Sequence, residues 1–309
     1  MKRLRIVTRQ SKLAIWQAEF VAAELQRFHP DIAISIKTIK TQGDKILNLP
    51  LAKIGGKGLF VKELEYSLLE ESADIAVHCM KDIPVQLLAG LQIATILKRD
   101  DPRDVLVSAK GYTVDSLPHK ARVGTSSLRR QAQLLRMRPD LQIIPLRGNI
   151  DTRLNKLITE NFDAIVLAAA GLQRLQFLEK YNHVFLDEML PAVGQGALGL
   201  ECRTSDIATQ EIIAVLHDID TANCILAERS MNVMLEGGCE APIGGFAFIA
   251  NDSLVLQGLV ASIDGQTLIQ EKMIGAKVEA EQLGKTLGSR LLSKGAKTLL
   301  ADLQREKRS

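Results

Sequence analysis

The chain has 309 residues, 46% of them hydrophobic and 24% charged, and its mean hydropathy of +0.06 indicates a soluble globular protein with two or three domains. The formal net charge of +3 is too small to indicate bulk affinity for nucleic acid, although local basic clusters can still bind acidic small molecules. The longest apolar run, residues 164–172, is too short to cross a membrane, and the basic N-terminus leads into an amphipathic pattern rather than a signal-peptide core, so we expect a cytoplasmic protein.

The first part of the chain predicts a βαβ unit. Residues 4–8 form a strand pattern, residues 11–29 an amphipathic helix and residues 32–36 an alternating strand. A further apolar strand, residues 74–77, begins with an aspartate and runs into residues 78–84. Because open α/β sheets bind ligands beyond the carboxyl ends of their strands, Lys81 and Asp82 are candidate site residues. An ion pair or a turn-capping aspartate is the structural alternative.

The same order of elements returns in the next part of the chain. It comprises a strand at 121–123, a helix at 127–138, a strand at 141–146 and an apolar strand at 163–167 that again begins with an aspartate. Both helices end in the pattern Arg-x-x-Pro-Asp. The chain therefore predicts two related α/β lobes, with a crossing at residues 98–104 and a return at residues 190–196. Two crossings favour a hinge.

The segment before the helix of the second lobe, Thr125-Ser126-Ser127-Leu128-Arg129-Arg130, is the most informative motif. Three hydroxyl residues precede the helix, and two arginines fall in its first turn. A helix N-terminus carries partial positive charge, so two guanidinium groups there are mildly unfavourable unless an anion is bound. The motif therefore indicates an acidic ligand. Ordinary capping with solvated arginines is the alternative.

After about residue 218 the pattern becomes that of a small α+β domain. A helix at 221–235 precedes strands at 246–249, 254–261 and 267–274, which are separated by turns, and a helical region at 278–303 follows. Cys239 follows Glu236-Gly237-Gly238 in a loop between the helix and the first strand. The loop position favours a thiol presented to a cleft, and a half-buried inert cysteine is the alternative.

The cysteine spacing and two familiar motifs indicate no disulfide, metal or nucleotide site. Cys79, Cys202, Cys224 and Cys239 lack the spacing of a disulfide framework or a zinc site, and Cys202 and Cys224 are expected to be buried small hydrophobes. Residues 194–199 fit G-x-G-x-x-G but follow no clear strand, and residues 284–286 fail as a P-loop. The latter three residues are expected to form a surface turn or a solvated helix face.

Further basic residues stand at predicted strand ends, near helix ends or in a glycine loop. Guanidinium groups that converge on a cleft between lobes bind carboxylates through charge-assisted hydrogen bonds. The residues in question are Arg9, Lys53, Lys57, Arg147, Arg153 and Arg174.

Through these residues the chain resembles the porphobilinogen deaminase family, also called the hydroxymethylbilane synthases. The resemblance covers nearly the whole chain and is most specific at residues 8–11, 55–60, 78–84, 123–130, 146–149, 191–196 and 236–239. It implies two lobes like those of periplasmic binding proteins and a third domain that carries the cysteine. We expect an α/β lobe at 1–98 to which residues 197–217 return, a second at 99–196, and an α+β domain at 218–309 with a three-stranded antiparallel sheet.

The resemblance implies a transferase of tetrapyrrole (haem and porphyrin) biosynthesis. Cys239 would hold one dipyrromethane cofactor through a thioether, and four porphobilinogen molecules would be added to it stepwise. Each step expels ammonia to give an electrophilic azafulvene, and water finally releases hydroxymethylbilane. The spacing of the cysteines and histidines indicates no metal site, and the small net charge and short apolar runs indicate no nucleic-acid or membrane partner. We expect a monomer, because no long apolar helix face or strand edge is left unassigned. The product is expected to pass to uroporphyrinogen-III synthase.

The resemblance also assigns roles to individual residues. Asp82 would bind pyrrole N–H groups and stabilise positive charge as it develops. The cofactor would be held by Lys81, Ser11, Thr125, Ser127, Arg129, Arg130, Arg147 and Gly148 in addition to Cys239. The substrate would be bound by Arg9, Arg147, Arg153, Arg174, Gln195, Lys53 and Lys57.

One position departs from the family pattern, since Cys79 stands where many relatives carry serine. A thiol donates a weaker hydrogen bond than a hydroxyl, so we expect a weaker cofactor contact rather than lost activity. Two other hypotheses remain: a noncatalytic anion-binding module of two lobes, and a relative that binds without turnover. Neither of the two lobes shows a basic helix-turn-helix pattern that would indicate DNA readout.

Overall fold

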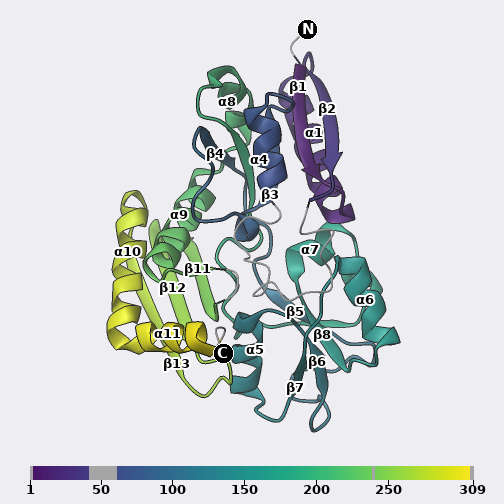
Figure 1. The fold of residues 1–309 in the computed structure, drawn as a ribbon, viewed down its shortest axis with the longest axis vertical. Coiled ribbons are helices and arrows are strands. Elements are labelled where there is room, and N and C mark those ends of the chain that lie inside the picture. The colour runs from purple at the N-terminus through teal and green to yellow at the C-terminus, as the bar shows by residue number, and fades with distance from the viewer. Residues whose placement is uncertain (1–2, 42–60, 239–240, 307–309) are drawn as a thin grey trace. The chain divides into compact units, whose positions relative to one another are not determined.

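The computed structural model describes residues 3–41, 61–238 and 241–306 (Figure 1). The chain divides into two compact units. The first comprises Met1–Asp100 and Ala197–Ala222, and the second comprises Asp101–Gly196 and Asn223–Ser309.

The first unit contains a five-stranded sheet of order β2-β1-β3-β10-β4. Its strands are β1 (Arg3–Arg9), β2 (Ala33–Ile39), β3 (Ile75–Cys79), β4 (Leu91–Ile96) and β10 (Leu198–Arg203). Its helices are α1 (Lys12–Phe28), α4 (Lys62–Leu69) and α8 (Ile207–Ile213), with short 3₁₀ turns η1 (Met80–Asp82) and η3 (Ala214–Leu216). The strands β1, β2 and β3 are parallel, whereas β10 is antiparallel to both β3 and β4.

Helical periodicity explains how α1 covers this sheet. Its buried positions Ala14, Ala18, Val21 and Leu25 recur every three or four residues and so form one apolar stripe. The stripe packs on the strand side chains that include Ile75, in one core cluster. A separate cluster places α4 against other side chains of the sheet, among them those of Val7 and Ala76. Because successive strand residues point to opposite faces, α1 and α4 cover the two faces of the sheet.

The second unit contains a five-stranded sheet of order β7-β6-β8-β5-β9. Its strands are β5 (Asp104–Val107), β6 (Arg122–Gly124), β7 (Gln142–Ile144), β8 (Ala164–Ala168) and β9 (His183–Phe185). Its helices are α5 (Leu128–Met137), α6 (Ile150–Thr159) and α7 (Ala169–Arg174), with the 3₁₀ turn η2 (Leu178–Lys180). The pairing repeats that of the first sheet, since β6, β7 and β8 are parallel and β5 is antiparallel to β8 and β9.

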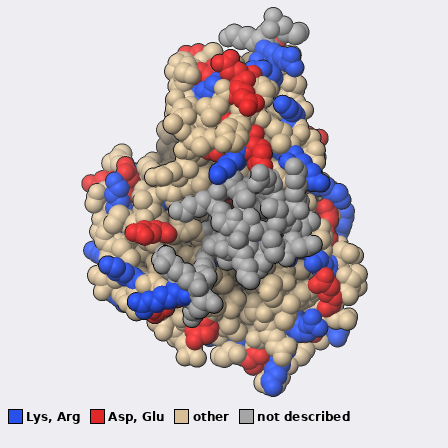
Figure 2. Space-filling view, in the orientation of Figure 1, with Lys and Arg blue, Asp and Glu red and all other residues tan. Residues whose placement is uncertain are grey.

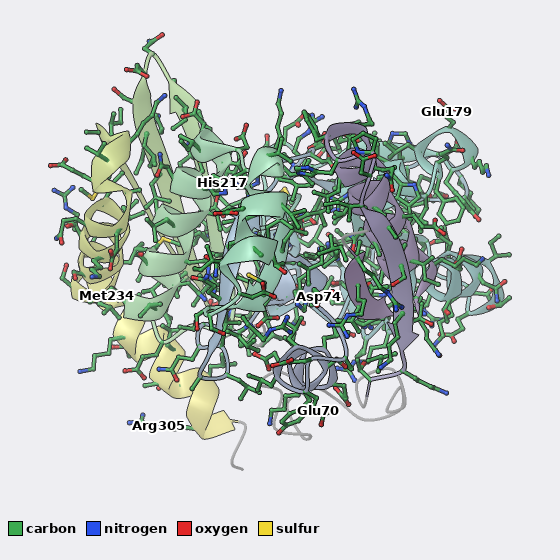
Figure 3. The ribbon with its side chains drawn as sticks, turned by 90° about the horizontal axis from the view of Figure 1, so that it is seen from above. Glu70, Asp74, Glu179, His217, Met234 and Arg305 are labelled. Carbon is green, nitrogen blue, oxygen red and sulfur yellow. The ribbon has the colours of Figure 1, made fainter. Side chains whose placement is uncertain are left out.

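The aspartates directly before β3 and β8 make the same contact in each sheet. The Asp74 carboxylate, labelled in Figure 3, accepts from the backbone N–H of Arg5 at 2.7 Å. The Asp163 carboxylate accepts from the backbone N–H of Arg122 at 2.8 Å. The repeated strand order and these repeated contacts confirm the prediction of two related α/β lobes.

The second unit also contains a three-stranded antiparallel sheet, β11-β12-β13, with α10 and α11 beside it (Figure 1). Its strands are β11 (Ile243–Ala250), β12 (Ser253–Ala261) and β13 (Leu268–Ala276). The helices are α9 (Ile219–Met234), α10 (Ala280–Leu291) and α11 (Lys297–Glu306), with η4 (Lys277–Glu279) and η5 (Leu292–Ala296) between strand and helices. One apolar cluster joins α9, β12 and α10, which confirms the predicted α+β organisation.

One detail of this part adds to the sequence-based expectations, and another corrects them. The helical region at 278–303 is interrupted at Gly295, whose φ of 108° is non-helical. Gly284 does not lie in a surface turn, because it is buried on α10, where a Cβ would stand 2.2 Å from the carbonyl oxygen of Ala227 on α9. A side chain at position 284 would therefore push the two helices apart, while Lys285 beside it is solvated as expected.

The surface shows mixed charge. On the face seen in Figure 2, Lys and Arg side chains alternate with Asp and Glu side chains, in keeping with the small net charge. None of the described helices is both long enough and apolar enough to cross a membrane.

Candidate active site

The first sheet gathers four predicted site residues at one edge. Arg9 ends β1, Ser11 caps α1 by accepting from the Ala14 N–H at 3.2 Å, and Lys81 and Asp82 lie in η1 directly after β3. The strands β1 and β3 are parallel neighbours, so their carboxyl ends lie at the same edge. Asp82 is exposed there and Lys81 is half-buried.

Residue 79, at the end of β3, has a partner within the first unit. The Cys79 sulfur accepts from the side-chain amide of Gln17 at 3.0 Å, and Gln17 is buried on α1. The other two described cysteines, Cys202 and Cys224, are buried, as expected of small hydrophobes. Burial raises the pKa of the Cys202 thiol to about 11, which keeps it protonated and unreactive at neutral pH.

The second sheet presents the hydroxyl and arginine motif after β6. Ser127 is the N-cap of α5, and its Oγ accepts from the Arg130 N–H at 3.4 Å. The Thr125 Oγ1 accepts from the Ser127 N–H at 3.1 Å. The capping interpretation is therefore correct for Ser127. The arginines, however, are not solvated, because Arg129 and Arg130 are 4% and 6% exposed.

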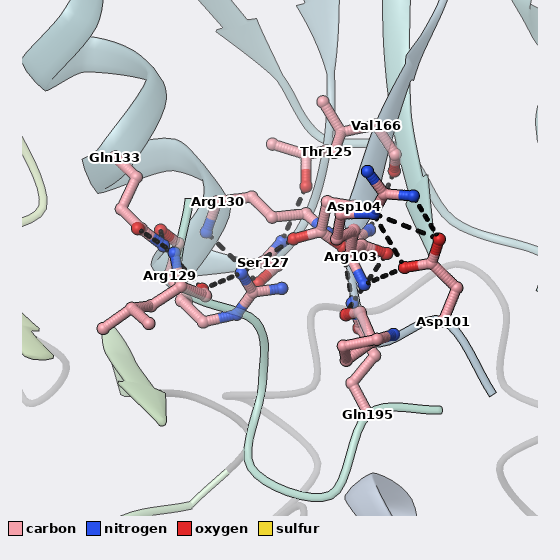
Figure 4. A network of polar contacts seen from close by, with 12 residues as sticks. Asp101, Arg103, Asp104, Thr125, Ser127, Arg129, Arg130, Gln133, Val166 and Gln195 are labelled. Carbon is pink, nitrogen blue, oxygen red and sulfur yellow. Dashed lines mark hydrogen bonds and ion pairs between the residues drawn. The ribbon is translucent and has the colours of Figure 1, made fainter. Parts of the chain in front are cut away.

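Both arginines bind Asp104, the first residue of β5, which is fully buried (Figure 4). Arg129 Nη1 donates to Asp104 Oδ2 at 2.8 Å and to the Leu190 carbonyl at 2.7 Å. Arg130 donates to Asp104 Oδ1 through Nε at 3.1 Å and through Nη2 at 2.8 Å, and its Nη1 reaches the Val166 carbonyl at 2.8 Å. The first anion that these arginines bind is thus a carboxylate of the chain itself.

The electrostatics of this cluster leave it cationic. Burial alone would raise the pKa of Asp104, but the ion pairs with Arg129 and Arg130 outweigh burial and hold that pKa well below its usual range. One carboxylate and two guanidinium groups carry a net charge of +1. The Arg129 Nε is buried and has no hydrogen-bond partner among the described residues. The cluster therefore has both the charge and a donor for one further anion.

Two other side chains, those of Gln195 and Gln133, hold the cluster in place. The Gln195 side-chain nitrogen donates to Asp104 Oδ1 at 2.9 Å and to the Pro102 carbonyl at 2.7 Å. The Gln133 side-chain amide makes two hydrogen bonds to the backbone of Leu190, accepting from its N–H at 2.8 Å and donating to its carbonyl at 3.0 Å. The Leu190 carbonyl also accepts from Arg129, so both Arg129 and Gln133 connect α5 to the return segment at residues 190–196.

Sequence reasoning missed Asp104 and Gln133. Asp104 stands at the end of a run of charged residues, which is typical of a solvated linker. The available signal was the apolar Val105-Leu106-Val107 that follows it, because an aspartate that begins a fully buried strand is buried with that strand. Nothing in the sequence around Gln133 indicates its role, since its partner is the backbone of Leu190, far along the chain.

The remaining described site residues of the second unit lie after β7 and β8. Gly148 has a φ of 118°, a conformation that favours glycine, and its carbonyl accepts from Arg153 Nε at 2.8 Å. Arg147 precedes it and is half-buried. Arg174 at the end of α7 is 6% exposed, and its Nη2 donates to the Gly196 carbonyl at 2.8 Å. Cys239, Lys53 and Lys57 lie outside the described residues.

Comparison with solved structures finds similarities of low identity. The YhfZ protein of Shigella flexneri is 15% identical, with 75% of this chain and 96% of that chain aligned at a TM-score of 0.39. The probable amino-acid transporter extracellular-binding protein ytmK of Bacillus subtilis is 12% identical, with 70% and 90% aligned at 0.41. The periplasmic aliphatic sulphonate binding protein SsuA of Escherichia coli is 15% identical, with 76% and 71% aligned at 0.41.

Two protein-family models match the chain. Residues 4–211 match the model described as "Porphobilinogen deaminase, dipyromethane cofactor binding domain". Residues 222–293 match the model described as "Porphobilinogen deaminase, C-terminal domain". The chain therefore belongs to the porphobilinogen deaminase family, the hydroxymethylbilane synthases of tetrapyrrole synthesis, which are transferases with a dipyrromethane cofactor.

Proposed function

We propose that the protein joins four porphobilinogen molecules stepwise to a dipyrromethane held by Cys239 through a thioether, releasing ammonia at each step and hydroxymethylbilane by final hydrolysis. When bound, the dipyrromethane would supply the free pyrrole α-carbon to which the first unit is joined, and each later unit would be joined to the pyrrole added before it. The product would pass to uroporphyrinogen-III synthase, and we propose a cytoplasmic monomer with no nucleic-acid partner.

The observation that carries this proposal is the Asp104–Arg129–Arg130 cluster. A dipyrromethane brings acetate and propionate carboxylates, and the cluster offers a net positive charge together with the buried, unpartnered Arg129 Nε. The nearby hydroxyls of Thr125 and Ser127 accept from backbone N–H groups, so each keeps its own hydrogen to donate. These residues therefore fit a carboxylate of the cofactor.

We propose the roles of the other residues from the family resemblance. Lys81, Ser11, Arg147 and Gly148 would complete the cofactor site, whereas Arg9, Arg153, Arg174, Lys53 and Lys57 would bind substrate carboxylates. Gln195 is 1% exposed, and its amide is hydrogen-bonded to Asp104. We therefore propose that Gln195 acts on bound carboxylates by holding Asp104 and, through it, the two arginines.

Asp82 is proposed as the catalytic residue. Its exposed carboxylate follows a buried strand and lies at the edge where parallel strands end. Departure of ammonia leaves positive charge on the substrate, and a carboxylate beside it lowers the energy of that charge. The same carboxylate can accept the proton lost from the carbon that forms the new bond.

We propose three domains. Lobe 1 comprises residues 1–98 with the return segment 197–217, lobe 2 comprises residues 99–196, and the third domain comprises residues 218–309. The compact unit Met1–Asp100 with Ala197–Ala222 supports the first of these, and the two separate sheets of the other unit support its further division. This arrangement gives Arg129 and Arg130, the catalytic aspartate and the attachment cysteine to three different domains.

Replacement of Asp82 tests the catalytic role. We expect Asp82→Ala to retain the covalent cofactor, seen as added mass, and to lose turnover by at least about a hundredfold, as general acid–base groups contribute at least that much. Asp31→Ala, at an exposed position of the same unit, is the matched control and should keep wild-type turnover. Full activity in Asp82→Ala would contradict the assignment, and a wild type that binds porphobilinogen without releasing ammonia would favour the noncatalytic binding module.

A further inference from the structure

Three ionisable side chains are buried together behind the turn that carries Asp82. Glu65 on α4 is 2% exposed, His78 on β3 is 6% exposed and Glu201 on β10 is fully buried. Alternation along the two strands places His78 and Glu201 with Ala76, on the face of the first sheet that α4 covers. None of the three has a role in the chemistry proposed above.

His78 and Glu201 fix the strand just before the turn. His78 Nε2 lies 2.9 Å from Glu201 Oε2, and both side chains are excluded from solvent. Gly199, the backbone partner of His78 across the two strands, is two residues from Glu201. The pair therefore ties the end of β3, four residues before Asp82, to β10.

Glu65 fixes the chain just after the turn. Its Oε1 accepts from the backbone N–H of Leu88 at 3.1 Å. Leu88 lies in the loop between η1 and β4, six residues after Asp82, and its own carbonyl accepts from the Leu91 N–H at 3.2 Å. A single buried carboxylate thus connects this loop to α4.

The turn is also anchored at its first residue. The Met80 N–H donates to the Ala197 carbonyl at 3.0 Å, and the Met80 side chain is 2% exposed. It occupies the space beside Gly199, where a Cβ would lie 2.3 Å from the Met80 sulfur. Strand, turn and following loop are therefore all held from the buried side, while Asp82 faces solvent.

Such a cluster is a poor source of stability. Burial raises the pKa of Glu65, which shows that its charged form is disfavoured there. Glu201 Oε1 is buried without a hydrogen-bond partner among the described residues. Apolar residues of similar volume in place of buried ionic groups are often neutral or stabilising, and the neighbours Val7, Leu64 and Leu68 are already apolar. A geometric role explains the cluster better than a contribution to stability.

We propose that Glu65, His78 and Glu201 are positioning residues that hold the Met80–Asp82 turn so that the Asp82 carboxylate meets the reacting groups. This inference rests on the catalytic role given to Asp82 under the proposed function. Misplacement of a catalytic group by about 1 Å can cost about a hundredfold in rate. Loss of either the His78–Glu201 contact or the Glu65–Leu88 hydrogen bond is therefore expected to lower kcat. KM should stay within about twofold of wild type, since substrate carboxylates are bound elsewhere.

The test compares Glu65→Leu with Glu65→Gln. Leucine cannot accept the Leu88 N–H, whereas the glutamine side-chain carbonyl can. We expect amide hydrogen exchange of the Leu88 region to accelerate in Glu65→Leu, both before and after cofactor loading, and kcat to fall by at least about tenfold. Glu65→Gln should restore slow exchange and most of kcat.

Leu64→Ala is the control for a purely structural effect. Leu64 is the 1%-exposed neighbour of Glu65 on α4, and its truncation leaves a cavity that lowers Tm. Exchange at Leu88 and kcat should stay near wild type in this variant, measured well below its Tm. A Leu64→Ala variant that loses as much kcat as Glu65→Leu would overturn the positioning role, as would Glu65→Leu with fast exchange at Leu88 and wild-type kcat.

A double-mutant cycle on the His78–Glu201 pair remains informative if Glu65→Leu does not fold. If His78 and Glu201 act as a unit, His78→Gln combined with Glu201→Gln should lose no more kcat than the more damaging single variant. Additive losses would contradict the unit. Asp82→Ala in the same assay separates the two proposals: wild-type turnover there defeats the proposed function, whereas an inactive Asp82→Ala beside fully active Glu65 and Glu201 variants defeats only the positioning role.

Discussion

At the scale of single residues, Asp104 explains how two arginines can be buried at the start of a helix. Arg129 and Arg130 oppose the dipole of α5, and each is nearly inaccessible to solvent. Asp104 supplies the anion that offsets both effects. Because Asp104 neutralises one of the two charges, the two guanidinium groups are held in place without a ligand and the cluster keeps a net charge of +1.

Asp104→Asn should therefore destabilise the protein in a pH-dependent way. In the wild type, the pKa of the Asp104 carboxyl is lower in the folded protein than in the unfolded chain. Its contribution to the free energy of unfolding is therefore fully present above the unfolded pKa of about 3.9 and is lost as the pH falls toward the folded pKa. We expect a loss of about 3–5 kcal/mol at pH 7, because a buried ion pair is broken. The Tm difference from wild type should shrink as the pH falls below about 4.

Thermal unfolding of both proteins between pH 7 and pH 3 measures this effect. Asp31→Asn, at an exposed position, is the control and should follow the wild-type curve. A Tm difference for Asp104→Asn that stays constant over the whole range would show that the carboxylate charge is not what matters.

The motif at residues 125–130 could be predicted from the sequence, but its hydrogen-bond partner Asp104 could not. Ser127 and the two arginines were recognisable because capping residues and charges act within one helical turn. Asp104 lies more than twenty residues earlier, and only the tertiary pairing of β5 with β8 brings it beneath α5. Asp104 ends a run of charged residues, which is typical of an exposed linker, so its burial was not predicted.

At the scale of elements, the turn between β12 and β13 packs against α5. Gly265 has a φ of 72°, and a Cβ there would stand 2.4 Å from the Ala132 carbonyl oxygen and 2.6 Å from the Arg136 nitrogen. Arg136 Nη1 also donates to the Gln266 carbonyl at 3.2 Å. The small antiparallel sheet and the helix that carries Arg129 and Arg130 thus meet backbone to backbone.

Gly265→Ala should separate these two elements. Positive φ alone costs a non-glycine residue about 1–2 kcal/mol, and the overlap with α5 should add about 1–3 kcal/mol. Gly111→Ala is a matched control, because Gly111 has the same φ of 72° but its nearest atom would lie 3.9 Å away. Calorimetry should give a lower Tm for Gly265→Ala than for Gly111→Ala, and equal Tm values would refute the contact.

Prediction at this scale succeeded where periodicity is strong. The apolar stripe of α1 and the turn residues on either side of β12 gave both elements to within a few residues. The C-terminal segment was predicted only as a helical region, because the pattern alone does not reveal that Gly295 adopts a φ of 108° and divides it. The burial of Gly284 was likewise hidden, since a glycine gives no sign of which neighbour approaches it.

At the scale of the whole molecule, the central claim is a covalent cofactor carried by an α/β transferase. Repetition in the sequence was enough to predict two lobes, because the same strand, helix and aspartate pattern occurs twice and folds into the same strand order. We propose that the cofactor is attached at Cys239 because of the family resemblance at residues 236–239, and Cys239 lies outside the described residues.

The most direct test is the intact mass of the purified protein beside Cys239→Ser. We expect the wild type to exceed the mass of its sequence by that of two linked pyrroles, and the variant to show no addition, because serine lacks the thiol that forms the thioether. A wild type without added mass, which remains unmodified after incubation with porphobilinogen, would contradict the account.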